Sequence, residues 1–90
     1  MTASRAHLTL YGREYCHLCQ DMLAALEILR GERGGDFELD VLDIDADPLL
    51  VERYDEFVPV LAAGTGENAR ELCRYFLDVA AVRAYLAEFR

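Results

Sequence analysis

The amino-acid sequence predicts an α/β fold in which helices cover both faces of a small four-stranded mixed sheet. Three observations support it: stretches of alternating apolar residues, stretches with helical apolar spacing between them, and turns rich in glycine or proline at their boundaries. The predicted order is β-α-β-α-β-β-α, in a single domain spanning residues 1–90. The first two strands should be parallel with a right-handed crossover, and the last two should form an antiparallel hairpin.

The first strand precedes the pair of closely spaced cysteines, and the first helix begins at Cys16. The strand, residues 7–12, alternates leucine with more polar residues and ends at a glycine. From Cys16 to about Arg30, apolar residues recur at intervals of three and four, which predicts a helix with one buried face. These apolar residues are Leu18, Met22, Leu26 and Leu29. The glycine-rich segment 31–35 ends the helix.

The second strand is expected within residues 36–45, where apolar and acidic residues alternate up to Val41. The alternation slips at Leu42 and Ile44, which predicts a strand that is apolar on both faces at its far end.

A short second helix should follow. Asp47 is suited to its N-cap and Pro48 to its first helical position. Leu50, Val51 and Tyr54 would form its buried stripe.

The last part of the chain predicts two strands and a final helix. A strand covers residues 58–64 and begins at a proline, a turn covers 64–68, and the returning strand covers 69–76. Asp78 is the expected N-cap of the final helix. The helix residues expected on its buried face are Val79, Val82, Leu86 and Phe89.

Composition narrows the function classes. The net charge is −8, and the pI is about 4.5, so a nucleic-acid partner or an anionic membrane surface is not expected, because both call for a basic face. No segment approaches the roughly 18 apolar residues of a membrane helix. The N-terminal residues lack the apolar core of a signal peptide. We therefore expect a cytoplasmic protein.

Cys16 and Cys19 suggest three kinds of site: a metal site, an inert packed pair or a reversible disulfide. Cys16 follows a strand and a turn at the start of a helix, where free N–H groups and the helix dipole stabilise a thiolate. Cys19 lies one helical turn further on, on the same side. This context favours a redox pair in which Cys16 is the nucleophile and Cys19 the resolving thiol. Arg13 adds a positive charge nearby.

A metal site is less favoured, because zinc needs about four ligands. The further candidates Cys73, His7 and His17 fall on separate predicted elements. We expect Cys73 to be a small buried hydrophobic residue and His7 a surface residue. His17 is either a modulator of the thiolate or a plain exposed residue of the first helical turn.

The segment YGREYCHLC, followed about forty residues later by FVPVL, resembles the thioredoxin-like superfamily, and glutaredoxins most closely. The chain is similar to a group of short bacterial glutaredoxin-like proteins over residues 7–89. The resemblance implies a thioredoxin-like fold and a cis peptide bond before Pro59, with Pro59 facing the two cysteines and the Val58 backbone pairing with the substrate. The residues expected to bind substrate are Arg13, Tyr15, His17, Val58, Pro59 and Asp78.

The chain departs from classical glutaredoxins at two places. His17 and Leu18 replace the usual proline and aromatic residue between the cysteines. Phe76 and Leu77 replace the glycine pair that binds glutathione in the family, and only the following Asp78 is retained. Glutathione is therefore expected to be at most a weakly bound co-substrate. The second cysteine argues against the monothiol iron–sulfur branch of the family.

The expected function is that of a small cytoplasmic dithiol–disulfide oxidoreductase without a tightly bound cofactor or metal. Its partners would be protein or small-molecule disulfides, with glutathione or thioredoxin reductase as possible electron donors. The alternative is a non-catalytic thioredoxin-like module that binds a partner or senses redox state.

Overall fold

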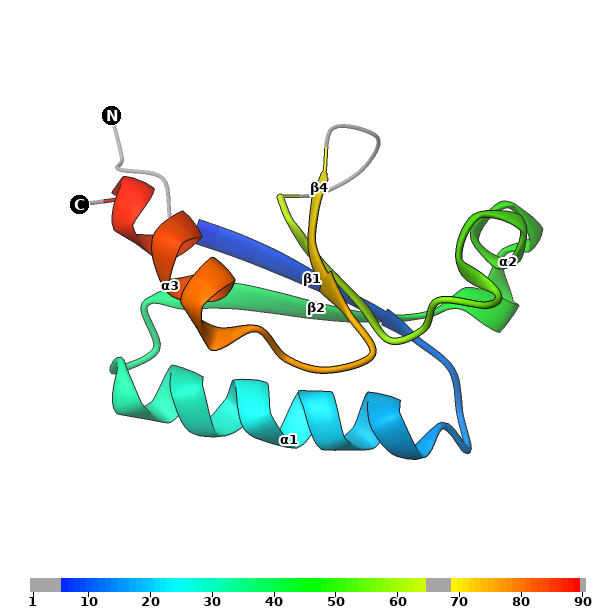
Figure 1. Ribbon diagram of the computed structural model, residues 1–90, viewed down its shortest axis with the longest axis horizontal. Helices are drawn as coiled ribbons and strands as arrows, with labels where there is room; N and C mark the ends of the chain where they lie inside the picture. Colours follow the sequence, from blue (N-terminus) through cyan, green and yellow to red (C-terminus); the bar gives the residue numbers. More distant parts are fainter. Residues whose placement is uncertain (1–5, 65–68, 90) are drawn as a thin grey trace.

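The computed structural model describes residues 6–64 and 69–89, which form one four-stranded sheet with helices on both sides (Figure 1). The strand order is β2-β1-β3-β4. The strands are β1 (Ala6–Gly12), β2 (Phe37–Asp43), β3 (Val60–Ala63) and β4 (Arg70–Arg74). β1 pairs with β2 in parallel, whereas β3 pairs antiparallel with both β1 and β4. The predicted mixed sheet is confirmed, as are the parallel pair β1–β2 and the antiparallel pair β3–β4, while the pairing of β3 with β1 was not predicted. Most of the predicted 64–68 turn lies outside the described residues.

Three α-helices and two short 3-10 helices complete the described fold. They are α1 (His17–Glu32), η1 (Ile44–Ala46), α2 (Pro48–Tyr54), α3 (Val79–Leu86) and η3 (Ala87–Phe89). Asp47 and Asp78 are the N-caps of α2 and α3, as predicted, and each side chain accepts a backbone N–H of the first turn. Pro48 occupies the first position of α2. No helix in the described part of the chain is both long and apolar enough to cross a membrane.

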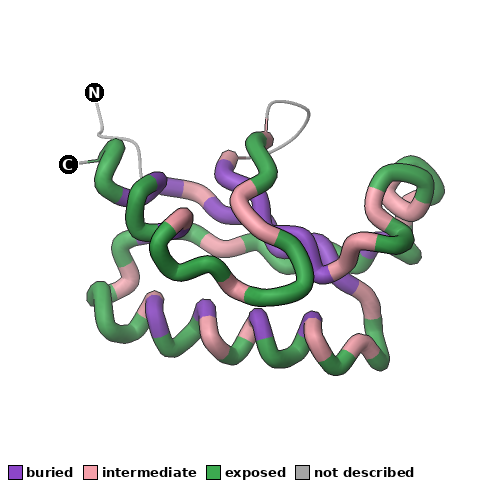
Figure 2. Tube along the Cα trace, viewed as in Figure 1, coloured by how far each residue is buried: buried purple, intermediate pink, exposed green. Residues whose placement is uncertain are grey.

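The sheet has an apolar cluster on each face. On one face, Leu8 and Leu10 of β1 pack with α1 and α3 in the larger cluster. On the other face, Tyr11 joins Ile44 and α2 in the smaller one, and its ring stacks on that of Tyr54 at 4.4 Å. Figure 2 shows the buried residues concentrated in the central strands and on one side of α1. The prediction that helices cover both faces is therefore confirmed.

Burial on β2 differs from the prediction. The far end of this strand is apolar but not buried on both faces, because Val41 is 52% exposed and Leu42 is 40% exposed. β2 is an edge strand that pairs only with β1 among the described strands. β2 ends at Asp43, and the fully buried Ile44 belongs to η1 instead.

The buried face of the final helix also differs from the prediction. Val82 and Leu86 are buried, but Val79 and Phe89 are about two-fifths exposed. Tyr85 takes a place in the core, where its hydroxyl donates to the carbonyl of His7 and accepts its N–H, both at 3.2 Å. A phenol could enter the core here because β1 supplies partners for its hydroxyl.

Candidate redox site

The two cysteines lie where β1 passes into α1. β1 ends at Gly12, and Cys16 has extended backbone angles as the N-cap of α1. Tyr15 precedes it with φ 60°, a left-handed conformation unusual for a residue with a side chain, and that side chain is almost fully exposed. The loop between strand and helix therefore turns sharply at Tyr15 and presents Cys16 at the helix N-terminus.

Cys16 and Cys19 are joined by a disulfide, with their Cα atoms 5.1 Å apart. Cys16 is half-buried, whereas Cys19 is only 7% exposed and packs on the inner side of α1. The spacing of three residues thus brings the two sulfurs together as the sequence predicts. Of the two residues, Cys16 is the more exposed.

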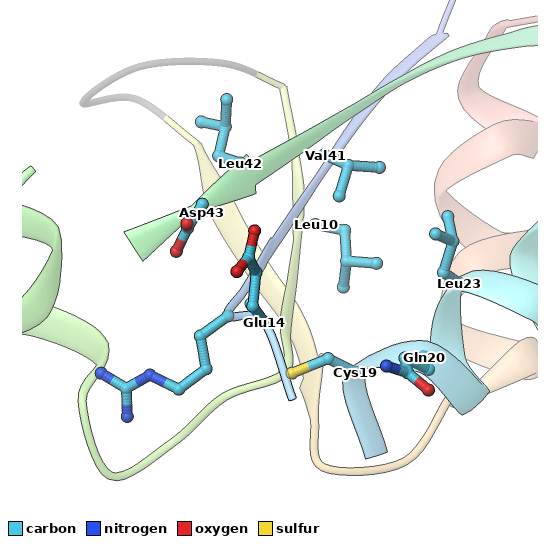
Figure 3. Close-up of a pocket in the computed structure, with 10 residues that line it drawn as sticks. Leu10, Glu14, Cys19, Gln20, Leu23, Val41, Leu42 and Asp43 are labelled. Atoms are coloured by element: carbon cyan, nitrogen blue, oxygen red, sulfur yellow. The ribbon is translucent and has the colours of Figure 1, made fainter. Parts of the chain in front are cut away.

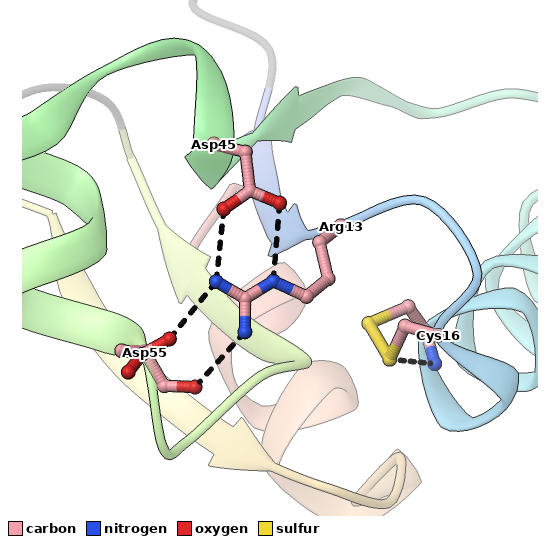
Figure 4. The surroundings of a disulfide bond; sticks show 5 residues. Arg13, Cys16, Asp45 and Asp55 are labelled. Carbon is pink, nitrogen blue, oxygen red and sulfur yellow. Dashed lines mark hydrogen bonds and ion pairs between the residues drawn. A yellow bond between two sulfur atoms is a disulfide. The ribbon is translucent and has the colours of Figure 1, made fainter.

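The helix N-terminus provides a specific interaction for Cys16. Its sulfur accepts a hydrogen bond from the backbone N–H of Cys19 at 3.2 Å (Figure 4). The first turn of α1 contains no acidic residue that would oppose a negative charge there. An N–H donor and the positive end of the helix dipole both favour negative charge at the position of the Cys16 sulfur.

Arg13 is held by two carboxylates rather than presented as an open charge. Its guanidinium makes two hydrogen bonds to Asp45, at 2.9 and 3.2 Å, and another to the Asp55 carboxylate at 2.9 Å. A longer contact of 3.4 Å reaches the carbonyl of Asp55 (Figure 4). The hydrogen bonds to Asp45 and Asp55 raise the pKa of Arg13. Arg13 therefore links the cysteine loop to η1 and to the end of α2, and its charge is already matched.

The Val58–Pro59 peptide bond is cis, which confirms that expectation. Pro59 is fully buried at the start of β3, and its carbonyl accepts the N–H of Tyr75 at 2.8 Å. Tyr11 pairs with Val60, so the start of β3 lies beside the end of β1.

Gly12, at the end of β1, packs against the side chain of Cys19. A Cβ added at this glycine would meet the Cys19 sulfur at 3.0 Å. The end of β1, the start of β3 and the cysteine turn therefore converge at one end of the sheet.

The segment expected to stand in place of the glycine pair, Phe76 and Leu77, follows Tyr75 directly. Tyr75 has φ 69° and Phe76 is 70% exposed, while Leu77 packs half-buried against the larger core cluster. Asp78 uses one carboxylate oxygen to accept the N–H of Ala81 at 3.0 Å. Here the chain presents an exposed aromatic side chain and a capping carboxylate.

The remaining candidates lie in separate places. His17 is exposed, and its Nε2 lies 3.9 Å from Oδ2 of Asp21, one turn along α1. His7 pairs with Asp40 at 2.9 Å between β1 and β2. Across residues 6–64 and 69–89, no group of three or more His, Cys, Asp or Glu side chains is arranged to hold a metal ion.

Cys73 packs against the larger core cluster but is half-buried, so it is less enclosed than the buried residue predicted. Its sulfur accepts the N–H of Asp78 at 3.5 Å. Burial raises the pKa of the Cys73 thiol, so this sulfur is less reactive than an exposed cysteine at neutral pH.

Sequence reasoning missed the two carboxylates that bind Arg13. Asp45 and Asp55 lie more than thirty residues away along the chain, and nothing in their local pattern separates them from the many other acidic residues. It also gave no role to Tyr75, because the left-handed conformation of a tyrosine carries no sequence signal.

Comparison with known proteins gives a consistent result. The family model described as a glutaredoxin-like domain (DUF836) matches residues 7–87. Among solved structures, protein Ne2328 from Nitrosomonas europaea is 42% identical, with 96% of each chain covered and a TM-score of 0.77. No match was found among curated proteins.

More distant structures share the fold alone. Mitochondrial thioredoxin 3 from Saccharomyces cerevisiae, in its oxidised form, is 14% identical, with 94% of this chain and 79% of that chain covered and a TM-score of 0.66. Thioredoxin from Fasciola hepatica is also 14% identical, with 96% and 82% covered and a TM-score of 0.67.

Proposed function

The chain belongs to the glutaredoxin-like domain (DUF836) family, and from this membership together with its bonded cysteine pair we propose that it is a dithiol–disulfide oxidoreductase. One observation carries most weight. The half-buried Cys16 sulfur accepts the N–H of Cys19 at the N-terminus of α1, whereas Cys19 is buried. This arrangement supports Cys16 as the attacking sulfur and Cys19 as the resolving one.

The proposed reaction starts from the reduced protein. The Cys16 thiolate attacks one sulfur of a substrate disulfide, the substrate S–S bond breaks, and the departing thiolate takes a proton from water. Cys19 then loses its proton and attacks the Cys16 sulfur, which releases the second substrate thiol. Two electrons pass to the substrate, and the protein is left with the Cys16–Cys19 disulfide. An external thiol or a reductase must return two electrons before the next turnover.

We propose disulfides of proteins or small molecules as substrates, with glutathione disfavoured. The γ-glutamyl end of glutathione carries an ammonium and a carboxylate that need close backbone approach and charged partners. Phe76 and Leu77 carry side chains where glycines would permit that approach. Asp78 could still receive an ammonium through its exposed carboxylate, although one of its oxygens caps α3. Arg13 offers little to a carboxylate while Asp45 and Asp55 hold it.

The protein is proposed to act in the cytoplasm, where other thiols keep the pair reduced. We propose a reductase of the thioredoxin reductase type as its electron donor, rather than glutathione. Incubating the oxidised protein with each donor and NADPH, and counting released thiols, separates the two. Reduction by the glutathione system alone would contradict this choice of donor.

Two assays test the proposed activity. In the first, the protein reduces a disulfide-containing protein such as insulin with dithiothreitol as donor, and Cys16→Ser should abolish the acceleration. In the second, the protein acts on a glutathionylated peptide, for which we expect little activity. Loss of one or two charge-assisted hydrogen bonds, at about 1.5–3 kcal/mol each, would weaken glutathione binding by one to a few orders of magnitude.

The outcomes distinguish the alternatives. A preference for the glutathionylated peptide, of the size shown by a dithiol glutaredoxin run in parallel, would contradict the substrate proposal. No acceleration of either reaction by the wild-type protein would leave the non-catalytic binding or sensing module as the better description.

A further inference from the structure

The two edges of the sheet differ in how they meet solvent. On the β4 edge the exposed side chains are charged and paired: Arg74 is bound by Glu71 and lies 4.2 Å from the centre of the Phe57 ring. On the β2 edge, Val41 and Leu42 are exposed side by side in sequence. Proteins usually protect an edge strand with charges or a covering element, because its free backbone groups can pair with another chain. At the far end of β2 the exposed charges are acidic, with Asp40 and Asp43 on either side of Val41 and Leu42, and no described strand pairs with this edge.

Two hollows lie on either side of this end of β2. One, of about 250 Å³, lies between β2 and α1, with Leu10, Leu23 and Val41 around its apolar side and Cys19 at its base (Figure 3). The other, of about 620 Å³, lies between β2 and α2. Its apolar lining includes Tyr11, Leu42, Leu49 and Leu50. Leu42 borders both hollows, so they form one surface, which we call the β2 surface: Leu23, Val41, Leu42 and Leu49 with the hollows between them.

The charge around the β2 surface is negative. Glu14 and Asp43 line the first hollow, at the end away from Leu23 (Figure 3). Asp47 and Glu52 line the second together with one cation, Arg53, whose guanidinium lies 5.9 Å from the centre of the Tyr54 ring. Arg13 also lines the first hollow, but Asp45 and Asp55 hold its guanidinium. The net charge of −8 adds a long-range field of the same sign.

We propose that the β2 surface docks an extended segment of a partner protein in which apolar residues alternate with lysine or arginine. The backbone of such a segment can pair with the free edge of β2, and its alternate side chains reach the hollows on the two faces of the sheet. A lysine stem lies along the exposed Val41, while its ammonium reaches the carboxylates of Glu14 and Asp43. Apolar side chains fill the hollow beside Leu42 and Leu49.

A second copy of this chain fits the surface poorly, because pairing two β2 edges brings like carboxylates together. The β2 surface is also distinct from the reactive sulfur: Cys19, not Cys16, lines its first hollow. The proposal goes beyond the redox function and does not depend on it.

The test uses the full, oxidised chain and two cysteine-free peptides. One is the heptapeptide Lys-Val-Lys-Leu-Lys-Val-Lys with blocked ends, and the other carries glutamate in place of every lysine. Backbone amide shifts of the ¹⁵N-labelled protein report where each peptide binds and how tightly. We expect the lysine peptide to shift amides of β2 and of the start of α2, and to bind more weakly as salt is raised. The glutamate peptide should not bind.

Two variants compare the β2 surface with exposed apolar surface elsewhere. Leu42→Ser should weaken binding of the lysine peptide by about tenfold or more. Ile28→Ser, which removes a 64% exposed side chain from α1 outside the β2 surface, should bind as the wild type does. Glu14→Gln should weaken binding severalfold and reduce its salt dependence. Melting curves of all variants establish that they are folded.

Several results would overturn the proposal. One is absence of binding by the lysine peptide up to about 1 mM, the weak limit for a specific contact. Another is a set of shifts confined to residues around Cys16, Pro59 and Tyr75, which would place the peptide at the candidate redox site and not on β2. Unchanged affinity of Leu42→Ser for the lysine peptide would also overturn the proposal. Sedimentation equilibrium that shows a dimer of the wild type, lost in Leu42→Ser, would assign the surface to a second copy of the chain.

Discussion

Replacing Gly12 with alanine should displace Cys19 and lower the stability of the oxidised protein, because the new methyl group would contact the Cys19 side chain. The added Cβ would lie 3.0 Å from the sulfur and 3.2 Å from the Cβ of Cys19, so Cys19 must move by a few tenths of an ångström. Cys19 is 7% exposed and is tied to Cys16 by the disulfide, so it has little room to move. Overpacking of a well-packed site by one methyl group costs about 1–3 kcal/mol, and we expect Gly12→Ala to destabilise the oxidised protein by an amount in this range.

The redox state should change the size of this effect. In the reduced protein the Cys19 sulfur is released from Cys16 and can rotate away from the new methyl group, although the contact with its Cβ remains. The penalty is therefore larger in the oxidised form, which shifts the equilibrium toward the dithiol. A difference of about 1 kcal/mol corresponds to a rise of roughly 20 mV in the reduction potential.

Urea unfolding of oxidised and reduced protein measures both stabilities, and a glutathione redox buffer gives the potential. Gly31→Ala is the matched control, because a Cβ at Gly31 meets nothing within 4 Å and the residue lies in α1. It should stabilise both forms by about 0.5–1 kcal/mol. If Gly12→Ala leaves the oxidised protein as stable as the wild type, the reasoning from the close approach of Gly12 and Cys19 is wrong.

Three further perturbations test other parts of the account. Asp78→Ala should lower the free energy of unfolding, measured by urea denaturation, by about 0.5–2 kcal/mol, because it removes the cap of α3. Asp78→Asn should restore most of the loss, and equal stability of Asp78→Ala and the wild type would refute the capping role. Because burial raises the pKa of Cys73, the native state keeps this proton at a pH where the unfolded chain has lost it, so the contribution of Cys73 to stability falls as the pH rises through the unfolded value near 9.0. Iodoacetamide should accordingly label Cys73 more slowly in the native than in the urea-unfolded protein at pH 8–9, and equal rates would contradict its burial. Arg13→Met should lower the melting temperature, less so in high salt, because Asp45 and Asp55 lose their shared partner; an unchanged melting temperature would show that the link contributes nothing.

Local signals in the sequence predicted the frame of this protein well. Asp47 and Asp78 were identified as helix caps because a short acidic side chain before an apolar repeat satisfies free N–H groups within a few residues. The parallel pairing of β1 with β2 and the antiparallel pairing of β3 with β4 followed from the connections between them, whereas the order of the strands across the sheet was not predicted. The cis bond at Pro59 came instead from the family resemblance, since a proline alone does not specify it.

What failed depended on long-range arrangement. Val41 and Leu42 have the apolar character of a buried strand, but burial depends on which strand lies at the edge and on how far α1 covers it. Arg13 was expected to contribute a free charge beside Cys16, and the structure pairs it with Asp45 and Asp55 from segments that only the tertiary fold brings near. The spacing of residues along the chain carries no record of such contacts.

The proposed redox activity depends most on the division of roles between Cys16 and Cys19. A trapping experiment tests it directly: Cys19→Ser and Cys16→Ser are each reduced, mixed with an excess of a disulfide-containing protein such as insulin, quenched with acid and examined by mass spectrometry. We predict that Cys19→Ser accumulates a mixed disulfide at residue 16, because the attacking thiolate is present and the resolving thiol is missing. Cys16→Ser should give little or no adduct at Cys19, which is 7% exposed. Equal adducts in the two variants, or an adduct only in Cys16→Ser, would contradict the assignment of Cys16 as the nucleophile.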